Sequence, residues 1–346
     1  MILEERKKKV LEAIILDYIA TAEPVGSRTI TKKYDLGVSP ATIRNEMADL
    51  EDMGLIEQPH TSAGRIPSQI GYRYYVDFLM EKASLTSDIK KYIRKSLREE
   101  IRAKEHLIRR AVRLLSQISN YTAMMIMSSY SQNILSHIQL LPVSDSRLVL
   151  ILVLDNGHVE HQIIETRQAM SEKEIHELAD MLRLVVCGKT VEQWRGISLS
   201  GARSQWEGQI QLLQEILDVI EGALTIENER KVYLSGTLNI MNQPEFRDVE
   251  KVRQVLSMLE EQRALEEMMM RIDDNERQDI SIRIGTENEY ENLAACSFLT
   301  TTYHINGKIM GRIGLLGPTR MDYSKNISLL DFMSRYLSED ITGINI

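Results

Sequence analysis

The chain has 346 residues, of which 43% are hydrophobic and 27% charged, so it is long enough for two or three domains and too apolar for extended disorder. Its net charge of −8 is unevenly spread, because residues 1–113 carry 21 Lys/Arg against 17 Asp/Glu and residues 114–346 carry 21 against 33. A mildly basic front half and an acidic back half indicate two separate roles, although composition can also drift along a chain without functional meaning.

Composition and motifs exclude several classes of protein. Two distant cysteines, Cys187 and Cys296, cannot form a disulfide framework or a Cys-rich zinc site, and we expect no metal and no cofactor. The longest apolar run, Leu148–Leu154, is far shorter than the about 20 residues that cross a bilayer. Gly188-Lys189-Thr190 resembles the end of a phosphate-binding loop, but Arg183 stands where that loop needs glycine. We therefore expect a cytoplasmic protein that is neither an enzyme nor a membrane protein.

Three helices are predicted within the first fifty-three residues. Residues 4–22 show an amphipathic pattern, and Ser27 can cap a short second helix over Arg28–Tyr34. Ser39 is a good N-cap for a third helix that begins at Pro40 and ends near Met53, since proline favours the first helical position. Two helices, a turn and a third helix are the parts of a helix-turn-helix.

The third helix presents a polar outer face. Ile43, Met47 and Leu50 share an inward face, which leaves Thr42, Arg44 and Asn45 outside. A hydroxyl, a guanidinium and an amide are the groups that read base edges in a major groove. The side chains expected to contact the DNA backbone are Ser27, Arg28, Lys33 and Ser39.

A hairpin is predicted directly after this helix. Residues 55–58 read as a strand, residues 59–64 as a loop, and the return strand starts at Arg65, which gives the winged form of the motif. Arg65 stands where a side chain could enter a minor groove or meet a phosphate. Either Arg44 or Arg65 could instead be an ordinary solvated arginine, but the surrounding pattern favours DNA contact.

A long basic helix is predicted over residues 85–118. Residues 82–113 hold 11 Lys/Arg and only 4 Asp/Glu, so this helix could add sequence-independent phosphate contacts. It could equally be a solvated linker whose apolar stripe packs on a neighbouring domain, and the two readings are compatible.

The remainder of the chain predicts an antiparallel sheet with helices on it. The residues Asp155-Asn156-Gly157 are a strong hairpin signal, and Ser171 with Glu174 forms a capping box for a following helix. The expected strands are Ile138–Leu141, Leu148–Leu154, Val159–Ile164, Ile280–Ile284, Cys296–His304 and Lys308–Leu316.

Residues 198–275 carry one more helical pattern. Apolar residues spaced alternately by four and three predict either a seam between two subunits or a helix packed on its own domain. The residues of this seam are Trp206, Ile210, Leu213, Leu217, Ile220 and Leu224.

Several segments along the whole chain resemble the family of heat-inducible transcription repressors called HrcA. The segments that carry the resemblance are Pro24–Ile30, Ser39–Glu51, His60–Pro67, Gly71–Asp77, Leu234–Phe246 and Gly317–Tyr323. The resemblance implies an α+β multidomain fold with an N-terminal winged helix-turn-helix and a GAF-like α+β domain that is split by an inserted α/β dimerisation domain. The implied boundaries are a winged helix at 1–80, a basic linker helix at 81–118, GAF-like parts at 119–197 and 276–346, and the insertion at 198–275.

The resemblance also implies a function. A protein of this family is expected to repress chaperone operons, to bind an inverted-repeat operator on double-stranded DNA as a homodimer, and to be modulated by a chaperonin. It implies that the seam around Leu217 is a subunit interface. The alternative is a metabolite-gated regulator with a small ligand in the GAF-like domain, and a bound ligand that changes operator affinity would separate the two.

Overall fold

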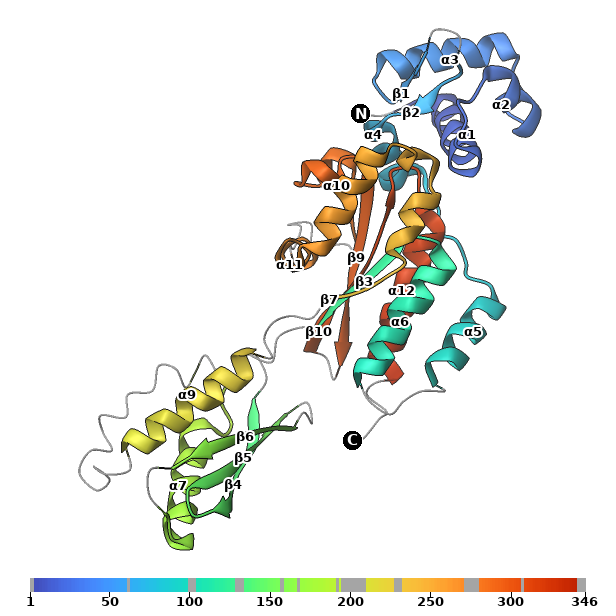
Figure 1. The fold of residues 1–346 in the computed structure, drawn as a ribbon. Coiled ribbons are helices and arrows are strands. Elements are labelled where there is room, and N and C mark those ends of the chain that lie inside the picture. The colour runs from blue at the N-terminus through green and yellow to red at the C-terminus, as the bar shows by residue number, and fades with distance from the viewer. Residues whose placement is uncertain are drawn as a thin grey trace. The chain divides into compact units, whose positions relative to one another are not determined.

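The computed structural model describes residues 3–340 except 61–62, 99–103, 128–133, 156–158, 167–168, 191–192, 194–209, 227–231, 271–279 and 306–307. Contacts divide the chain into two units, one of residues 1–127 and 232–345 and the other of residues 128–231 (Figure 1). We call residues 3–79 the head, residues 87–127 with 232–340 the sheet domain, and residues 134–226 the inserted unit.

The head contains the predicted winged helix. Helices α1 (Glu5–Thr21), α2 (Ser27–Lys33) and α3 (Pro40–Asp52) are followed by the antiparallel strands β1 (Ile56–Glu57) and β2 (Ile66–Pro67). These elements follow local signals, since the Ser39 hydroxyl accepts a hydrogen bond from the Thr42 N–H at 3.2 Å and caps α3 as expected. The inward residues of all three helices are buried in one core, among them Ile14, Ile15, Ile30, Ile43 and Leu50.

The last helical segment of the head follows β2. Helix α4 (Gln69–Tyr74) continues into a π-helical turn, η1 (Tyr75–Leu79). The Ser68 hydroxyl caps α4 by accepting from the Gly71 N–H at 3.0 Å. Gly71 leaves no room for a side chain, because a Cβ there would lie 2.0 Å from the Leu55 carbonyl oxygen. The helix therefore packs directly on the base of the wing.

The sheet domain is built on five antiparallel strands in the order β7-β3-β10-β9-β8. Strand β10 is central, with β3 and β9 on its two sides. Strands β3 and β7 are not among the predicted strands, whereas β8, β9 and β10 match predictions closely. The strands are β3 (Thr122–Met127), β7 (Val232–Ser235), β8 (Ile280–Ile284), β9 (Cys296–Ile305) and β10 (Lys308–Pro318).

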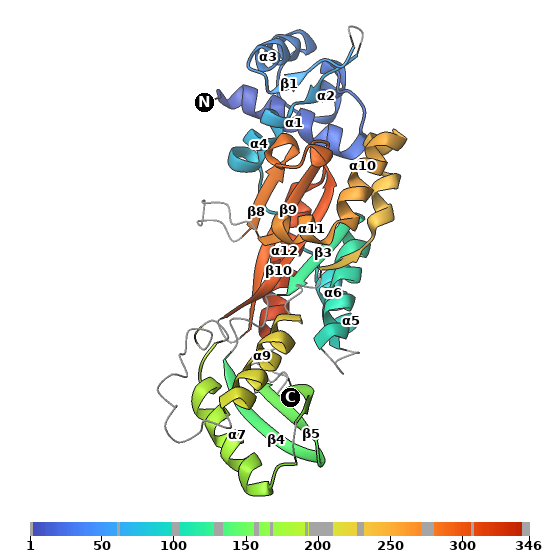
Figure 2. The same cartoon turned by 60° about the vertical axis from the view of Figure 1, so that its left-hand side comes forward.

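Helices cover both faces of this sheet (Figures 1 and 2). Strand β3 shows why, because Ala123 and Met125 enter one apolar core while Met124 and Ile126 enter the other. The first core includes α5 (Ser87–Arg98), α6 (Lys104–Ser119) and α12 (Tyr323–Asp340), and the second includes α10 (Val249–Glu260) and α11 (Gln262–Met270). The predicted basic helix thus corresponds to α5 and α6, whose apolar stripe packs on the sheet domain.

The inserted unit has its own three-stranded antiparallel sheet, β4-β5-β6. Its strands are β4 (Leu135–Ser144), β5 (Arg147–Leu154) and β6 (Val159–Glu165), and its helices are α7 (Glu172–Val186) and α9 (Ile210–Ile226). The capping box of Ser171 and Glu174 is present at the start of α7. Both helices pack on one face of the sheet and bury alternate strand residues.

The boundaries of this unit differ from the expected ones. We expected an insertion over 198–275, whereas the contacts separate residues 128–231, and residues 232–270 return to the sheet domain. The physical reason lies in strand pairing: β4, β5 and β6 pair with one another in a sheet of their own, whereas β8, β9 and β10 pair in the sheet that contains β3 and β7. Alternating hydrophobicity marks strands but does not tell which sheet they join.

The two cysteines are expected to differ in reactivity. Cys296 is fully buried on β9, where burial raises the pKa of its thiol to about 12, whereas Cys187 is half-buried and its thiol pKa is raised less strongly. Because the thiolate is the reactive form, a disulfide reagent at about pH 8 should modify Cys187 first and reach Cys296 only after unfolding. A titration of thiols in native and denatured protein measures this, and equal rates for both cysteines would contradict the buried position of Cys296.

Candidate nucleic-acid interface

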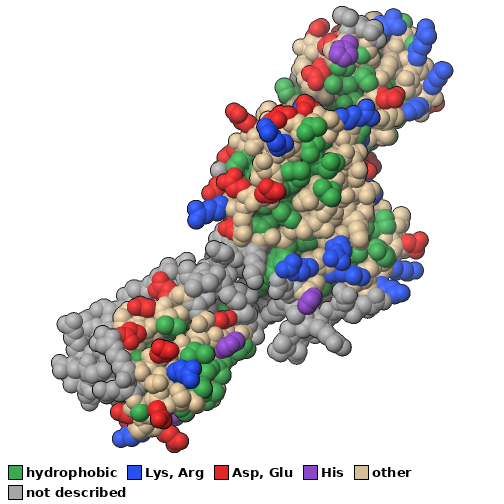
Figure 3. Space-filling view, viewed as in Figure 1, with side chains coloured by type: hydrophobic (Ala, Val, Ile, Leu, Met, Phe, Trp, Pro, Cys, Tyr) green, Lys and Arg blue, Asp and Glu red, His purple; other side chains and the backbone are tan. Residues whose placement is uncertain are grey.

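Three arginines from three elements of the head border one surface hollow. The hollow has a volume of about 430 Å³ and lies between α2, α3 and the wing. Arg28 comes from α2, Arg44 from α3, and Arg65 directly precedes β2. Lys and Arg side chains stand out at the end of the head that carries α2 (Figure 3). Such a concentration of cationic groups beside a helix-turn-helix suits a phosphate-bearing ligand.

The predicted base-reading residues of α3 lie on its outer face. Arg44 and Asn45 are exposed, and within the described part of the chain Arg44 forms no ion pair. Thr42 is half-buried, and its hydroxyl lies 3.0 Å from the Ser39 hydroxyl. Thr42 and Ser39 therefore already serve the helix cap, whereas Arg44 and Asn45 are available to an external partner.

Arg65 is held against α3. Its Nε and Nη2 atoms lie 2.9 and 2.7 Å from the same carboxylate oxygen of Glu51, and the Arg65 side chain is only 21% exposed. This ion pair joins the wing to α3. The sequence did not single out Glu51, because a contact across fourteen residues leaves no local pattern.

The residues predicted to contact the DNA backbone differ in their exposure and in their ion pairs. The Lys33 ammonium lies 2.5 Å from a carboxylate oxygen of Asp17, which is buried, so Lys33 fastens α2 to α1. Arg28 is exposed, and no ion pair engages it among the residues described. Ser27 is half-buried, and its carbonyl oxygen accepts from the Thr31 hydroxyl at 2.8 Å. Arg28 is therefore the most available cation of this set.

A backbone bridge fixes the wing. The Val25 N–H donates to the Arg65 carbonyl at 2.8 Å, and the Arg65 N–H donates to the Val25 carbonyl at 2.9 Å. Gly64 permits this approach, because a Cβ there would lie 2.5 Å from the Val25 carbonyl oxygen. Gln58 braces the same loop by donating to the Ala63 carbonyl at 3.0 Å. The wing therefore has a defined position beside α2.

Two acidic residues of α3, Glu46 and Asp49, pair with cations of α1. The Lys7 ammonium lies 3.1 Å from Glu46 and 2.9 Å from Asp49, and these two carboxylates raise its pKa. Arg6 also pairs with Glu46, at 3.5 Å. Pairing offsets negative charge on α3 that would otherwise repel a phosphate-bearing ligand.

The described residues of the expected subunit seam lie in or against the core of the inserted unit. Leu213 and Ile220 are buried there, Leu217 is partly buried against the same core, and all three contribute to the packing of α9 on its own sheet. Trp206 lies outside the described residues, and so do the side chains of Ile210 and Leu224. This placement matches the alternative of a helix packed on its own domain.

Other kinds of site find no support within the described ranges. There, no three side chains of the His, Cys, Asp and Glu types gather closely enough to bind a metal ion. None of the helices described is both long and apolar enough to span a bilayer.

Comparisons with known proteins agree with one family. The family described as "HrcA protein C terminal domain" matches residues 105–327. The heat-inducible transcription repressor HrcA of Desulforamulus reducens is 42% identical over 344 residues, which cover 99% of both chains. That of Pelotomaculum thermopropionicum is 43% identical over 344 residues, covering 99% of this chain and 98% of the relative. A crystal structure of a protein described as hypothetical shares the fold with a TM-score of 0.62 at 23% identity, covering 99% of both chains.

These matches confirm the resemblance seen in the sequence motifs. They include the region of residues 105–230, where few motifs supported it. The relatives named here are transcription repressors. The chain belongs to the HrcA family of heat-inducible transcription repressors.

Proposed function

We propose that this negative regulator of heat-shock genes binds an inverted-repeat operator as a homodimer, with α3 of each subunit in a major groove. The observation that carries the proposal is the hollow between α2, α3 and the wing, which brings Arg28, Arg44 and Arg65 to one surface. A two-fold symmetric pair of such heads requires a two-fold symmetric operator. A repressor of this kind would act in the cytoplasm, where bacterial DNA lies.

The structure suggests a ranking of the proposed contacts. Arg44 and Asn45 are exposed and are proposed to read bases, while Arg28 is proposed to bind a phosphate. Arg65 and Lys33 would have to exchange Glu51 and Asp17 for DNA, so their net contributions should be smaller. The hydroxyls of Thr42, Ser27 and Ser39 are proposed to make supporting contacts.

The homodimer is proposed to form through the inserted unit. One face of its sheet is buried under α7 and α9. On the other face the central strand β5 is apolar at Val149, Ile151 and Val153, and its neighbours there include the polar residues Gln139, His137 and His161. The paired residues Leu141, Val149 and Ile163 form one row across this outer face, in which Leu141 is 40% and Ile163 62% exposed. A strand whose side chains are apolar on both faces of the sheet is typical of a sheet that packs between two layers. A second copy offers the same face and would complete the sandwich by an isologous contact.

We further propose that the sheet domain is a GAF-like domain interrupted between β3 and β7. These strands are paired neighbours, so an insertion between them leaves the five-stranded sheet intact. A chaperonin is proposed to keep the repressor active. A small ligand in the sheet domain is the alternative regulator, and a metabolite that changes operator affinity without chaperonin would favour it.

Arg44→Ala tests base reading. If Arg44 forks onto a base, its loss should cost about 1–3 kcal/mol of specific affinity, relax one operator position and leave nonspecific DNA binding almost unchanged. Arg28→Ala is the matched control, and it should weaken binding to all sequences alike and lower the salt slope by about one. Affinities measured for operator and random duplexes at several salt concentrations separate the two. Equal loss on both duplexes from Arg44→Ala would eliminate its base-reading role.

Gly64→Ala tests the position of the wing. The added Cβ cannot fit against the Val25 carbonyl, so the bridge to Arg65 should break and operator affinity should fall. Gly222→Ala in α9 is the control, because a Cβ there meets nothing within 4 Å. Operator titrations with both variants give the comparison, and wild-type affinity in Gly64→Ala would show that the wing does not need this bridge.

Ile163→Asp tests the proposed dimer face. An unpaired charge buried within an apolar contact is strongly unfavourable, so the variant should be monomeric at concentrations where the wild type is dimeric. Leu184→Asp is a matched control, because Leu184 is 81% exposed on α7. Sedimentation measures both, and a dimeric Ile163→Asp variant would refute the assignment of this face.

A further inference from the structure

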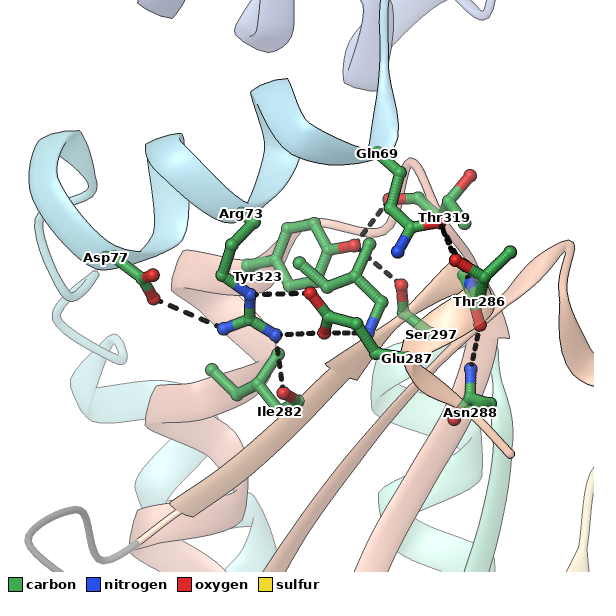
Figure 4. Close-up of polar contacts among 12 residues, drawn as sticks. Gln69, Arg73, Asp77, Ile282, Thr286, Glu287, Asn288, Ser297, Thr319 and Tyr323 are labelled. Atoms are coloured by element: carbon green, nitrogen blue, oxygen red, sulfur yellow. Dashed lines mark hydrogen bonds and ion pairs between the residues drawn. The ribbon is translucent and has the colours of Figure 1, made fainter. Parts of the chain in front are cut away.

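Arg73 of α4 reaches from the head into the sheet domain. Its Nε lies 2.9 Å from Glu287, its Nη2 contacts the other oxygen of the same carboxylate, and Nη2 also donates to the Ile282 carbonyl at 2.6 Å (Figure 4). On the head side, its Nη1 donates to Asp77 at 3.2 Å. A two-pronged arginine–carboxylate contact fixes direction as well as distance. Arg73 therefore holds α4 in one orientation on the edge of β8.

Gln69, one helical turn before Arg73, contacts the loop that follows β8 and contains Glu287. Its side-chain carbonyl accepts from the N–H and the hydroxyl of Thr286 at 2.9 and 2.8 Å (Figure 4). The preceding residue is Gly285 with φ 58°, and a Cβ there would lie 2.6 Å from the Gln69 oxygen. The loop thus has a glycine where the head makes its closest approach, and two residues on one face of α4 contact residues 286–287.

Arg320 of the sheet domain makes the reciprocal contact with the head. It follows β10, and its Nη1 donates to the Ile19 carbonyl in the last turn of α1 at 2.8 Å. Glu245 and Gln243 hold the other guanidinium nitrogens, and the Arg320 side chain is only 12% exposed. A cation at the C-terminal end of a helix is favoured by the helix dipole. This contact lies on a different helix from that of Arg73.

An apolar contact joins the two polar ones. Tyr72 of α4 is buried, with its ring centre 5.9 Å from that of Tyr323. Tyr323 is itself fixed, because its hydroxyl lies 2.7 Å from the Ser297 hydroxyl and donates to the Thr319 carbonyl at 2.5 Å (Figure 4). Helices α1 and α4 are thus both attached to the sheet domain, and α1 is attached to α3 through Lys7.

We propose that Arg73 and Arg320 are positioning residues that fix the orientation of the recognition helix on the sheet domain, so that the state of the sheet domain controls operator affinity. The inference rests on the proposed DNA binding only for its second half. With both anchors in place, a movement of residues 282–287 or 318–323 must carry α4 and α1 with it, and therefore α3. With one anchor removed, the head can pivot about the other, and operator affinity falls because fewer heads are correctly oriented.

The orientation is measured without DNA. Spin labels are placed at Glu57→Cys in the wing and Val249→Cys on α10, both exposed positions, in a Cys187→Ser background diluted with unlabelled chain. We expect a single narrow distance distribution with the native arginine, a broad one in Arg73→Glu and in Glu287→Arg, and a narrow one again in the double charge swap. Arg73→Met, which keeps the length of the side chain without its charge, replaces Arg73→Glu if that variant fails to fold.

The functional half is measured on the same variants. Operator affinity should fall by about 5- to 150-fold in Arg73→Glu, the usual range for coupled sites, and recover in the double swap. A narrow distribution in Arg73→Glu, a broad one in the wild type, or broadening without loss of operator affinity would each overturn the inference. If the wild-type chain shows no operator preference, the proposed function is wrong. The distance measurement would still test whether Arg73 fixes the orientation of the head.

Discussion

The antiparallel bridge between Val25 and Arg65 joins the wing to the start of α2 and closes the head. It holds the wing against the start of α2, and only a residue without a side chain at position 64 permits the approach. Because the bridge fixes the wing, Arg28, Arg44 and Arg65 border a single hollow although they come from three elements. The candidate interface therefore depends on one backbone contact between segments forty residues apart in the sequence.

Charge in the head serves two separate purposes. Lys7, Lys33 and Arg65 are paired with carboxylates and hold α1, α2, α3 and the wing together. Arg28 and Arg44 are exposed and provide attraction for an anionic partner. Because Glu46, Asp49 and Glu51 of α3 are each paired with a cation, they do not cancel the positive charge of Arg28 and Arg44, although the net charge of the chain is −8. The same principle extends to the contact between the head and the sheet domain, where Arg73 of the head pairs with Glu287 and Arg320 of the sheet domain pairs with Glu245 and contacts α1.

Much of this arrangement could be predicted from local signals in the sequence. Ser39 and Pro40 predict the start of α3, and the spacing of its apolar residues predicts its inner face. Both signals can be recognised because helix caps and helical periodicity involve residues only a few positions apart. Long-range pairing leaves no such record. Strand β3 pairs with β7, and Arg65 pairs with Glu51, across long stretches of sequence. The boundaries of the inserted unit depend on such long-range contacts as well. The apolar seam of α9 could not be assigned from the sequence for a related reason. A helix packed on its own sheet and a helix at a subunit interface show the same spacing of apolar residues.

The most direct test of operator recognition is the selection of preferred duplexes from a random-sequence pool by the full-length chain, alone and with purified chaperonin. The account predicts recovery of an inverted repeat whose two half-sites match, and stronger enrichment when chaperonin is present. Recovery without chaperonin dependence would retain the dimeric repressor and favour a small ligand as regulator. The absence of any sequence preference in both conditions would contradict the central claim that α3 reads DNA.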